Sequence, residues 1–211
     1  YPDLEELIQD IAQAYRTVIR DLYDAGCRNI QFDDCTWGMF CDKNYWEARQ
    51  EDSVSLEEEA EKYLRLNNLA LENAPEDLVI TTHVCRGNYH STWASSGGYE
   101  PIAPFLFANE NVSAYYLEFD DERSGGFEPL RFVSDDKKVV LGLVTSKSPI
   151  LEEKEVIKKR IAKAAKYIPL DRLYLSPQCG FASCEIGNKL TEEEQWAKLA
   201  LVKEIAKEVW G

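Results

Sequence analysis

The 211-residue sequence predicts an α/β fold in which about five parallel strands alternate with helices in a single unit. Three observations predict it. Short β-branched runs alternate with longer segments whose apolar residues recur at helical spacing, as in parallel β–α units. No internal repeat, low-complexity tract or linker divides the sequence. Apolar residues make up 45% of the chain and charged residues 29%, a composition typical of a protein with its own packed core.

The first predicted helix covers residues 3–26, because its apolar residues recur at helical spacing and Gly26 is a good helix stop. The first strand, residues 28–34, follows directly and finishes in two carboxylates. Residues 55–74 return to helical spacing, and either Ser53 or Ser55 could cap this second helix.

The remaining predicted elements continue the same alternation to the end of the chain. The last helix runs to Trp210 and is expected to begin at a capping box made by Thr191 and Glu194. The other predicted strands are 78–83, 114–118, 139–144 and 173–176, and the other predicted helices are 101–109 and 150–167.

The charge of the chain excludes several classes of partner. Lys and Arg number 24 against 38 Asp and Glu, a formal net charge of −14. Such a surface repels phosphate backbones and anionic lipids, so we expect neither nucleic-acid nor membrane binding. No apolar run approaches the roughly 18 residues of a membrane span, and no charged-then-apolar leader opens the sequence. We therefore expect a cytoplasmic protein.

The residues that could carry chemistry stand at the ends of the predicted strands. In parallel β/α folds the loops after the strands surround a shared pocket, so reactive side chains collect there. His83 and Cys85 are two residues apart, which in extended backbone points both side chains to the same side. The candidates, in strand order, are Asp33 and Asp34, His83 and Cys85, Glu118, Lys147, and Cys179.

The candidates His83, Cys85, Glu118 and Cys179 are of the types that bind zinc in a tetrahedron. The closely spaced Cys-x2-Cys pairs of a local zinc knuckle are absent, so the fold would have to build the site. The residues alone leave other roles open, because a buried free cysteine is most often a small core residue and Lys147 could be an ordinary surface lysine.

Four segments follow one another in the order 30–34 (IQFDD), 82–85 (THVC), 116–118 (YLE) and 176–180 (SPQCG). Together they resemble the cobalamin-independent methionine synthase family, in its C-terminal catalytic barrel and especially in its shorter bacterial members. The most specific of them are His-x-Cys and Pro-x-Cys-Gly, and the resemblance extends from the first helix to Trp210.

This resemblance implies the C-terminal portion, about five β/α units, of a TIM-type (β/α)8 barrel. Residues 1–211 would then form a single catalytic-barrel domain in which the first β/α units, expected before Tyr1, are lacking. An open sheet would expose two edges and much apolar surface. We therefore expect self-association, such as a homodimer.

The resemblance also implies an activity and its residues. The family transfers a methyl group from 5-methyltetrahydrofolate to the zinc-bound thiolate of homocysteine, forming methionine. By motif, the zinc ligands fall on His83, Cys85, Glu118 and Cys179. The Asp that holds the homocysteine amino group falls on Asp33, and the acidic residue after it is Asp34. Glu118 is also expected to take part in substrate binding. Its carboxylate oxygen is the hardest, least polarisable, of the four ligand atoms, so its bond to zinc would weaken when the substrate sulfur binds.

One departure from the family pattern concerns the methyl donor. Methyl transfer from a tertiary amine needs a general acid at the leaving nitrogen. Where the larger enzymes have Asp-x-His, this chain has Thr145-Ser146-Lys147, which makes Lys147 the candidate catalytic residue. A lysine is a weak acid unless it is desolvated. Two alternatives stay open: a different methyl donor or thiol acceptor on the same zinc scaffold, or an inactive zinc-binding partial barrel.

Overall fold

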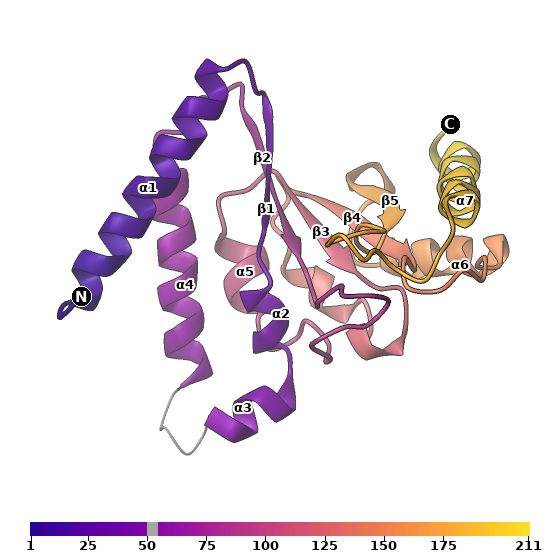
Figure 1. Cartoon of the computed structure of the whole chain (residues 1–211), viewed down its shortest axis with the longest axis horizontal. Coiled ribbons are helices and arrows are strands. Elements are labelled where there is room, and N and C mark those ends of the chain that lie inside the picture. The colour runs from indigo at the N-terminus through magenta and orange to yellow at the C-terminus, as the bar shows by residue number, and fades with distance from the viewer. Residues whose placement is uncertain (50–54) are drawn as a thin grey trace.

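The computed structural model of the chain describes residues 1–49 and 55–211 (Figure 1). Its centre is one parallel sheet of five strands in the order β1-β2-β3-β4-β5, so strands that follow one another in the sequence are also neighbours. This arrangement confirms the predicted α/β class. The strands are β1 (Asn29–Asp33), β2 (Val79–Val84), β3 (Ala114–Glu118), β4 (Lys138–Val144) and β5 (Leu173–Pro177).

Helices connect these strands, and two of them were not predicted. The short helices α2 and α3 follow β1, where the sequence has no helical periodicity long enough to detect. In the part of the chain that the structure describes, 3-10 helices cover Glu122–Ser124, Glu128–Phe132 and Leu170–Arg172. The helices are α1 (Leu4–Asp24), α2 (Thr36–Phe40), α3 (Lys43–Arg49), α4 (Leu56–Leu71), α5 (Ala103–Asn109), α6 (Lys154–Ala164) and α7 (Glu192–Trp210).

The ends of the long helices have clear local causes. The Asp3 side chain accepts a hydrogen bond from the first turn of α1, and the chain leaves this helix through Gly26 at φ +100°, a left-handed conformation that favours glycine. The Ser55 side chain caps α4, whereas Ser53 lies outside the described residues. The predicted capping box at Thr191 is present at the start of α7.

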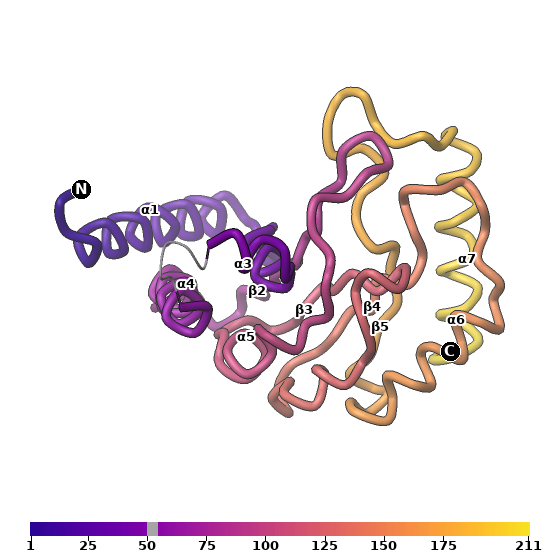
Figure 2. Tube along the Cα trace, turned by 90° about the horizontal axis from the view of Figure 1, so that it is seen from below, coloured from indigo at the N-terminus to yellow at the C-terminus, as the bar shows by residue number. Residues whose placement is uncertain are grey.

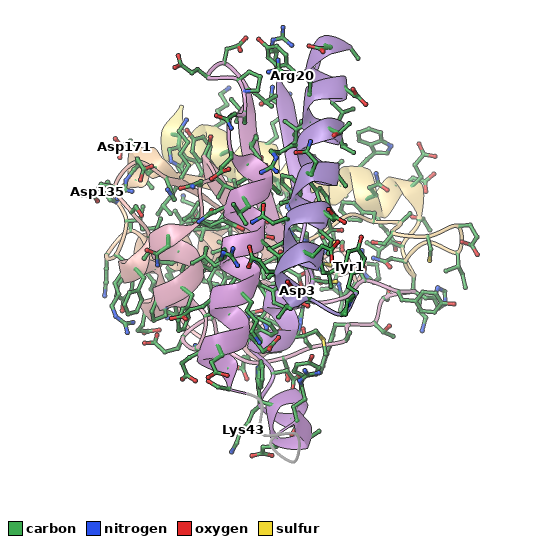
Figure 3. All side chains as sticks on the ribbon, turned by 90° about the vertical axis from the view of Figure 1, so that its left-hand side faces the viewer. Tyr1, Asp3, Arg20, Lys43, Asp135 and Asp171 are labelled. Carbon is green, nitrogen blue, oxygen red and sulfur yellow. The ribbon has the colours of Figure 1, made fainter. Side chains whose placement is uncertain are left out.

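The long helices lie in two groups beyond the two edges of the sheet. Helices α1 and α4 pack side by side next to β1, and α6 and α7 pack near β4 and β5 (Figures 1 and 2). Figure 3 looks directly onto α1 and α4, with Asp3 at one end of α1 and Arg20 towards the other. No helix within residues 1–49 and 55–211 combines the length and apolar character needed to span a membrane.

The sheet has a buried apolar face and a polar face. In β1, Phe32 packs against the core, whereas Gln31 and Asp33 are exposed, as expected when alternate residues point to opposite faces. The central strands β3 and β4 are buried almost throughout. Asp33 is in register with His83, and His83 is in register with Tyr116. The carboxyl ends of the first three strands therefore meet at one edge of the sheet.

Candidate metal centre

Four side chains predicted to bind metal meet at the carboxyl end of the sheet. His83 belongs to β2, Cys85 follows it, Glu118 ends β3 and Cys179 follows β5. One nitrogen, oxygen or sulfur atom of each lies within 4.8 Å of the corresponding atoms of the other three. The His83 Nε2 and Glu118 Oε1 atoms are 3.7 Å apart. The fold therefore joins residues that are almost a hundred positions apart in the sequence.

Burial and neighbouring side chains shift the pKa values of the groups in this cluster. Glu118 is fully buried, and this burial raises the pKa of its carboxyl group. The neighbouring thiol of Cys85 lowers the pKa of Cys179, while the pKa of Cys85 itself is raised, so Cys179 gives up its proton first. Within the described residues, the buried Nε2 of His83 has no hydrogen-bond partner. A buried nitrogen without a partner is costly unless something binds it, and a metal ion would.

Hydrogen bonds fix Glu118 from several directions. The Arg86 backbone N–H donates to Oε1 at 2.8 Å, and the Arg123 guanidinium donates to Oε2 at 3.0 Å. The Gln178 amide lies 3.5 Å from Oε2. The buried Tyr99 hydroxyl accepts from the Glu118 N–H at 2.9 Å and donates to the Glu118 carbonyl at 3.1 Å. Both the backbone and the carboxylate of Glu118 are thus held in place.

Sequence reasoning did not identify these supporting residues. Arg86 directly follows the His-x-Cys motif, which is the one signal that could have pointed to it. Tyr99 lies in an irregular segment and Arg123 in the short 3-10 helix Glu122–Ser124, so their approach to Glu118 follows from tertiary packing alone.

A glycine in α2 allows the close approach of the segment that carries Cys85. A Cβ atom at Gly38 would lie 2.3 Å from the Cys85 carbonyl oxygen, far inside van der Waals contact. Next to it, the Trp37 side chain is fully buried in the core. The backbone of Cys85 is therefore packed directly against α2, and only glycine fits at that point.

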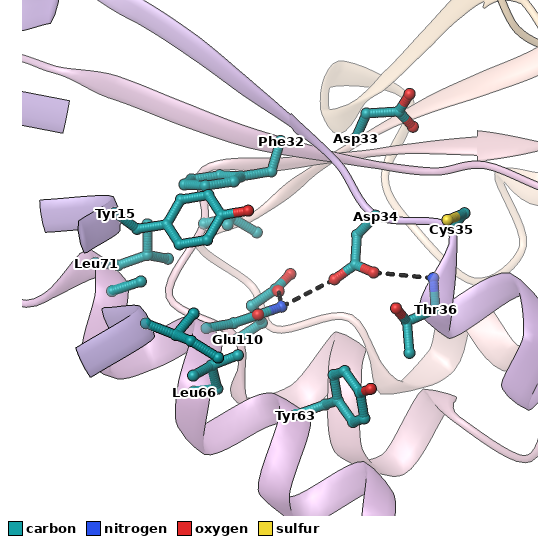
Figure 4. A pocket seen from close by; sticks show the side chains of 14 residues that line it. Tyr15, Phe32, Asp33, Asp34, Cys35, Thr36, Tyr63, Leu66, Leu71 and Glu110 are labelled. Carbon is teal, nitrogen blue, oxygen red and sulfur yellow. Dashed lines mark hydrogen bonds between the residues drawn. The ribbon is translucent and has the colours of Figure 1, made fainter. Parts of the chain in front are cut away.

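The two aspartates at the end of β1 point in different directions. Asp33 lines a cavity of about 380 Å³ together with His83 and Cys179. Asp34 lies on the helical side, where its carboxylate accepts hydrogen bonds from the Thr36 N–H at 3.0 Å and the Asn67 amide at 3.1 Å (Figure 4). The structure thus places Asp33 beside the four-residue cluster and separates the Asp34 side chain from it. Their predicted roles in substrate binding stay predictions.

Lys147 follows β4 and reaches the same region through a polar network. Its Nζ donates to Asn88 Oδ1 at 3.3 Å. The Asn88 amide donates in turn to the Gly180 carbonyl at 2.7 Å, next to Cys179. The positive charge of Lys147 also opposes the effect of burial on the pKa of Glu118. The lysine is therefore tied to the loop that carries Cys179, but its role in catalysis stays a prediction.

The fold and the site together define an α/β protein with a candidate metal centre of two sulfurs, an imidazole and a carboxylate at the ends of parallel strands. The sequence model of the family described as "cobalamin-independent synthase, catalytic domain" matches residues 2–208. The chain belongs to this family, which confirms the resemblance carried by its strand-end motifs.

Individual relatives agree with this assignment. Over 211 residues, the chain is 49% identical to the uncharacterized protein YxjH of Bacillus subtilis, and it covers 56% of that protein. It is 26% identical over 180 residues to the methionine synthase of Pyrococcus horikoshii, covering 85% of this chain and 44% of that enzyme. The chain thus spans about half the length of the curated relatives it matches.

Solved structures share the fold. The crystal structure of a putative vitamin-B12 independent methionine synthase from Listeria monocytogenes is similar over 100% of this chain and 57% of that one, with 40% identity and a TM-score of 0.79. A B12-independent methionine synthase from Shewanella has a TM-score of 0.71 at 21% identity, over 99% of this chain and 56% of that one, a likeness of fold alone. The prediction of five β/α units from a TIM-type barrel is thereby confirmed.

Proposed function

We propose that this chain is a zinc-dependent methyltransferase that moves a methyl group from 5-methyltetrahydrofolate to the sulfur of homocysteine, forming methionine. One observation carries the proposal: His83, Cys85, Glu118 and Cys179 bring their ligand atoms within 4.8 Å of one another at the strand ends. Membership of the cobalamin-independent synthase family supports it.

The residues of the cluster fit zinc. Imidazole nitrogen, thiolate sulfur and carboxylate oxygen are the ligands of protein zinc sites, and four of them complete a tetrahedron. The His83 Nε2 atom, buried without a partner in the described part of the chain, would gain one. When bound, zinc would supply a Lewis acid that keeps a substrate thiol deprotonated near neutral pH.

Asp33 is the proposed contact for the amino group of homocysteine. Its carboxylate lines the cavity beside His83 and Cys179, where a substrate sulfur would have to arrive. Asp34 would act less directly, since its carboxylate is engaged by Thr36 and Asn67 while its backbone N–H donates to the His83 carbonyl at 2.9 Å. We expect Asp34 to hold the ends of β1 and β2 together.

Lys147 is the proposed proton donor to the leaving nitrogen of the methyl donor. To reach that nitrogen, the Lys147 ammonium group would have to break its 3.3 Å hydrogen bond to Asn88 Oδ1. Two substitutions separate charge from proton donation. Lys147→Arg keeps the positive charge but cannot give up a proton, because a guanidinium stays protonated in proteins. If Lys147 acts as an acid, both Lys147→Arg and Lys147→Met lose turnover; if it only orients the donor, Lys147→Arg retains most of it.

The replacement of Asp-x-His by Thr145-Ser146-Lys147 favours a second candidate, the same thiol methylation with a different donor. The backbone N–H of Lys147 donates to the Thr145 hydroxyl at 3.2 Å, and the Ser146 hydroxyl is bonded to Gln178, so neither is placed as an acid. A sulfonium donor releases a neutral sulfide and needs no proton at the leaving atom. Parallel assays with 5-methyltetrahydrofolate and a sulfonium methyl donor separate the two candidates.

Metal analysis with matched variants tests the main proposal. We expect about one zinc per chain, and we expect Cys179→Ser to lose both zinc and methyl transfer. Cys184→Ser is the control, because Cys184 is another free, partly buried thiol five positions further along. Stoichiometric zinc in Cys179→Ser would show that the ligand assignment is wrong. Zinc without methyl transfer to homocysteine from either donor would leave a different thiol acceptor or the inactive partial barrel.

Self-association is a further part of the proposal. Within residues 1–49 and 55–211, β1 and β5 each pair on one side only, which leaves two sheet edges open. We expect a homodimer, and we expect residues 1–211 to behave as a single domain. Sedimentation velocity over a range of concentrations tests the first expectation, and a single cooperative unfolding transition tests the second.

A further inference from the structure

A second pocket lies between the sheet and the two long helices, away from the four-residue cluster. It has a volume of about 250 Å³ and is bounded by α1, β1, α4 and the segment that leads from α5 to β3. Asp33 stands at the border of this pocket and of the cavity beside His83. In Figure 4, however, the Asp33 side chain points away from the aromatic rings of Phe32 and Tyr15.

One wall of this pocket carries two carboxylates joined by a single amide. The Asn67 Nδ2 group donates to Asp34 Oδ2 at 3.1 Å and to Glu110 Oε1 at 2.8 Å. Glu110 is only 2% exposed, and its Oε2 atom is buried without a hydrogen-bond partner in the described part of the chain. Figure 4 shows the Asp34 and Glu110 carboxylates on the same side of the pocket.

Within residues 1–49 and 55–211, no basic side chain forms an ion pair with Asp34 or Glu110. The charge of Lys137 acts on Glu110, but the Lys137 ammonium is bonded to Asp136 at 3.1 Å. Burial raises the pKa of Glu110 to about 8, and the charge of Asp34 acts in the same direction. A buried carboxyl group with one unpaired oxygen is expensive, so a ligand that pairs with it would gain free energy.

The rest of the pocket lining is aromatic and aliphatic. Tyr15 and Phe32 pack with ring centroids 5.6 Å apart, and Tyr63 lines the same space. Ile11, Leu66 and Leu71 complete the apolar lining. Aromatic faces attract cations, and carboxylates pair with them, so both parts of the lining favour the same class of ligand.

We propose that this pocket binds a small organic ammonium ion, with its nitrogen at Asp34 and Glu110 and its apolar part against Tyr15, Phe32 and Tyr63. The pocket is large enough for a ligand of benzylammonium size and too small for most cofactors. The proposal does not depend on the methyltransferase activity, because the pocket contains none of the four candidate metal ligands.

Calorimetry with two probes of equal shape tests the proposal. Benzylammonium chloride and benzyl alcohol differ in charge and little else. We expect the ammonium ion to bind at least about tenfold more tightly, which corresponds to about 1.4 kcal/mol. We also expect binding to release protons, seen as a dependence of the heat on buffer ionisation, because a cation favours the charged form of Glu110. Equal binding of the two probes, or no binding of either, would overturn the proposal.

Two Glu→Gln substitutions, one in the pocket and one on the protein surface, locate the binding site. Glu110→Gln keeps the shape of the side chain and should weaken benzylammonium binding about tenfold. Glu61→Gln removes the same charge from an exposed position on α4 and should change nothing. In the wild-type chain, nuclear Overhauser contacts from the benzyl ring should reach Phe32 or Tyr63. Contacts only elsewhere, or unchanged binding in Glu110→Gln, would refute the assignment.

One further variant separates this inference from the proposed function. Cys179→Ser should abolish zinc binding and leave benzylammonium binding intact. If benzylammonium binding instead disappears together with zinc, the ligand occupies the cavity beside His83, and the inference fails while the proposed function stands.

Discussion

Removing one hydroxyl group, in Tyr99→Phe, should weaken both the fold and the metal centre. The Tyr99 hydroxyl is buried and holds Glu118 through the backbone N–H and carbonyl. Three hydrogen bonds are lost. The two with the Glu118 backbone are worth about 1 kcal/mol each, the long one from Arg86 Nε, at 3.5 Å, is weaker, and the Glu118 N–H left unpaired adds a further penalty. We expect the free energy of unfolding to fall by about 3 kcal/mol. We also expect zinc affinity to fall about tenfold or more, because Glu118 loses its support.

The matched control is Tyr115→Phe. This hydroxyl is equally buried but makes one hydrogen bond, to the Leu106 carbonyl at 2.7 Å, remote from the cluster. It should cost about 1 kcal/mol and leave zinc affinity unchanged. Urea unfolding of the zinc-free proteins measures stability, and competition with a coloured chelator measures affinity. A Tyr99→Phe protein that is as stable as Tyr115→Phe, or that binds zinc as tightly as the wild type, would show that the Tyr99 hydroxyl does not support Glu118.

Three further predictions concern particular positions. Gly38→Ala should destabilise the fold by about 1–3 kcal/mol in urea unfolding, because its Cβ would meet the Cys85 carbonyl, whereas Gly180→Ala, with open space around it, should not. Thr191→Ala removes the capping box of α7 and should cost about 1 kcal/mol in the same assay. Glu110 has a folded-state pKa of about 8, above its ordinary value of 4.5, so the stability it contributes is full below about pH 4.5 and is lost as the pH rises through about 8. Glu110→Gln should therefore flatten the decline in stability between those two values.

Each of these predictions has an outcome that contradicts it. Equal stability of the two glycine variants would mean that α2 can move away from the Cys85 segment. A Thr191→Ala protein as stable as wild type would mean that the first turn of α7 is already frayed in the wild type. If the stability of the wild type declines no more than that of Glu110→Gln as the pH rises through this range, Glu110 is already ionised in the folded chain.

The strands and the outer helices were predictable because their sequence patterns are local. The run 114–118 was predicted as a strand from its residue types and is β3 in the structure. The start of α7 follows from the spacing of Thr191 and Glu194. Helices α2 and α3 were missed because five and seven residues are too few to establish a period.

The candidate site was predictable as far as strand ends define it. His83 and Glu118 lie where parallel strands finish, and the topology alone brings such positions together. The support from Tyr99 and Arg123 was not predictable, since Tyr99 reaches Glu118 from an irregular segment and Arg123 from a 3-10 helix of only three residues. The separation of the Asp34 side chain from the cluster could have been predicted, because neighbouring strand residues point to opposite faces.

The position of each strand in the sheet determines which candidate metal ligand is held most loosely. His83 and Glu118 belong to strands with neighbours on both sides, whereas Cys179 follows β5, an edge strand of the described sheet. Edge segments exchange their amide hydrogens sooner than central ones, because fewer contacts must break. We therefore expect release of a bound ion to begin with the loss of Cys179 as a ligand. We also expect hydrogen exchange at the end of β5 to slow most when zinc is bound.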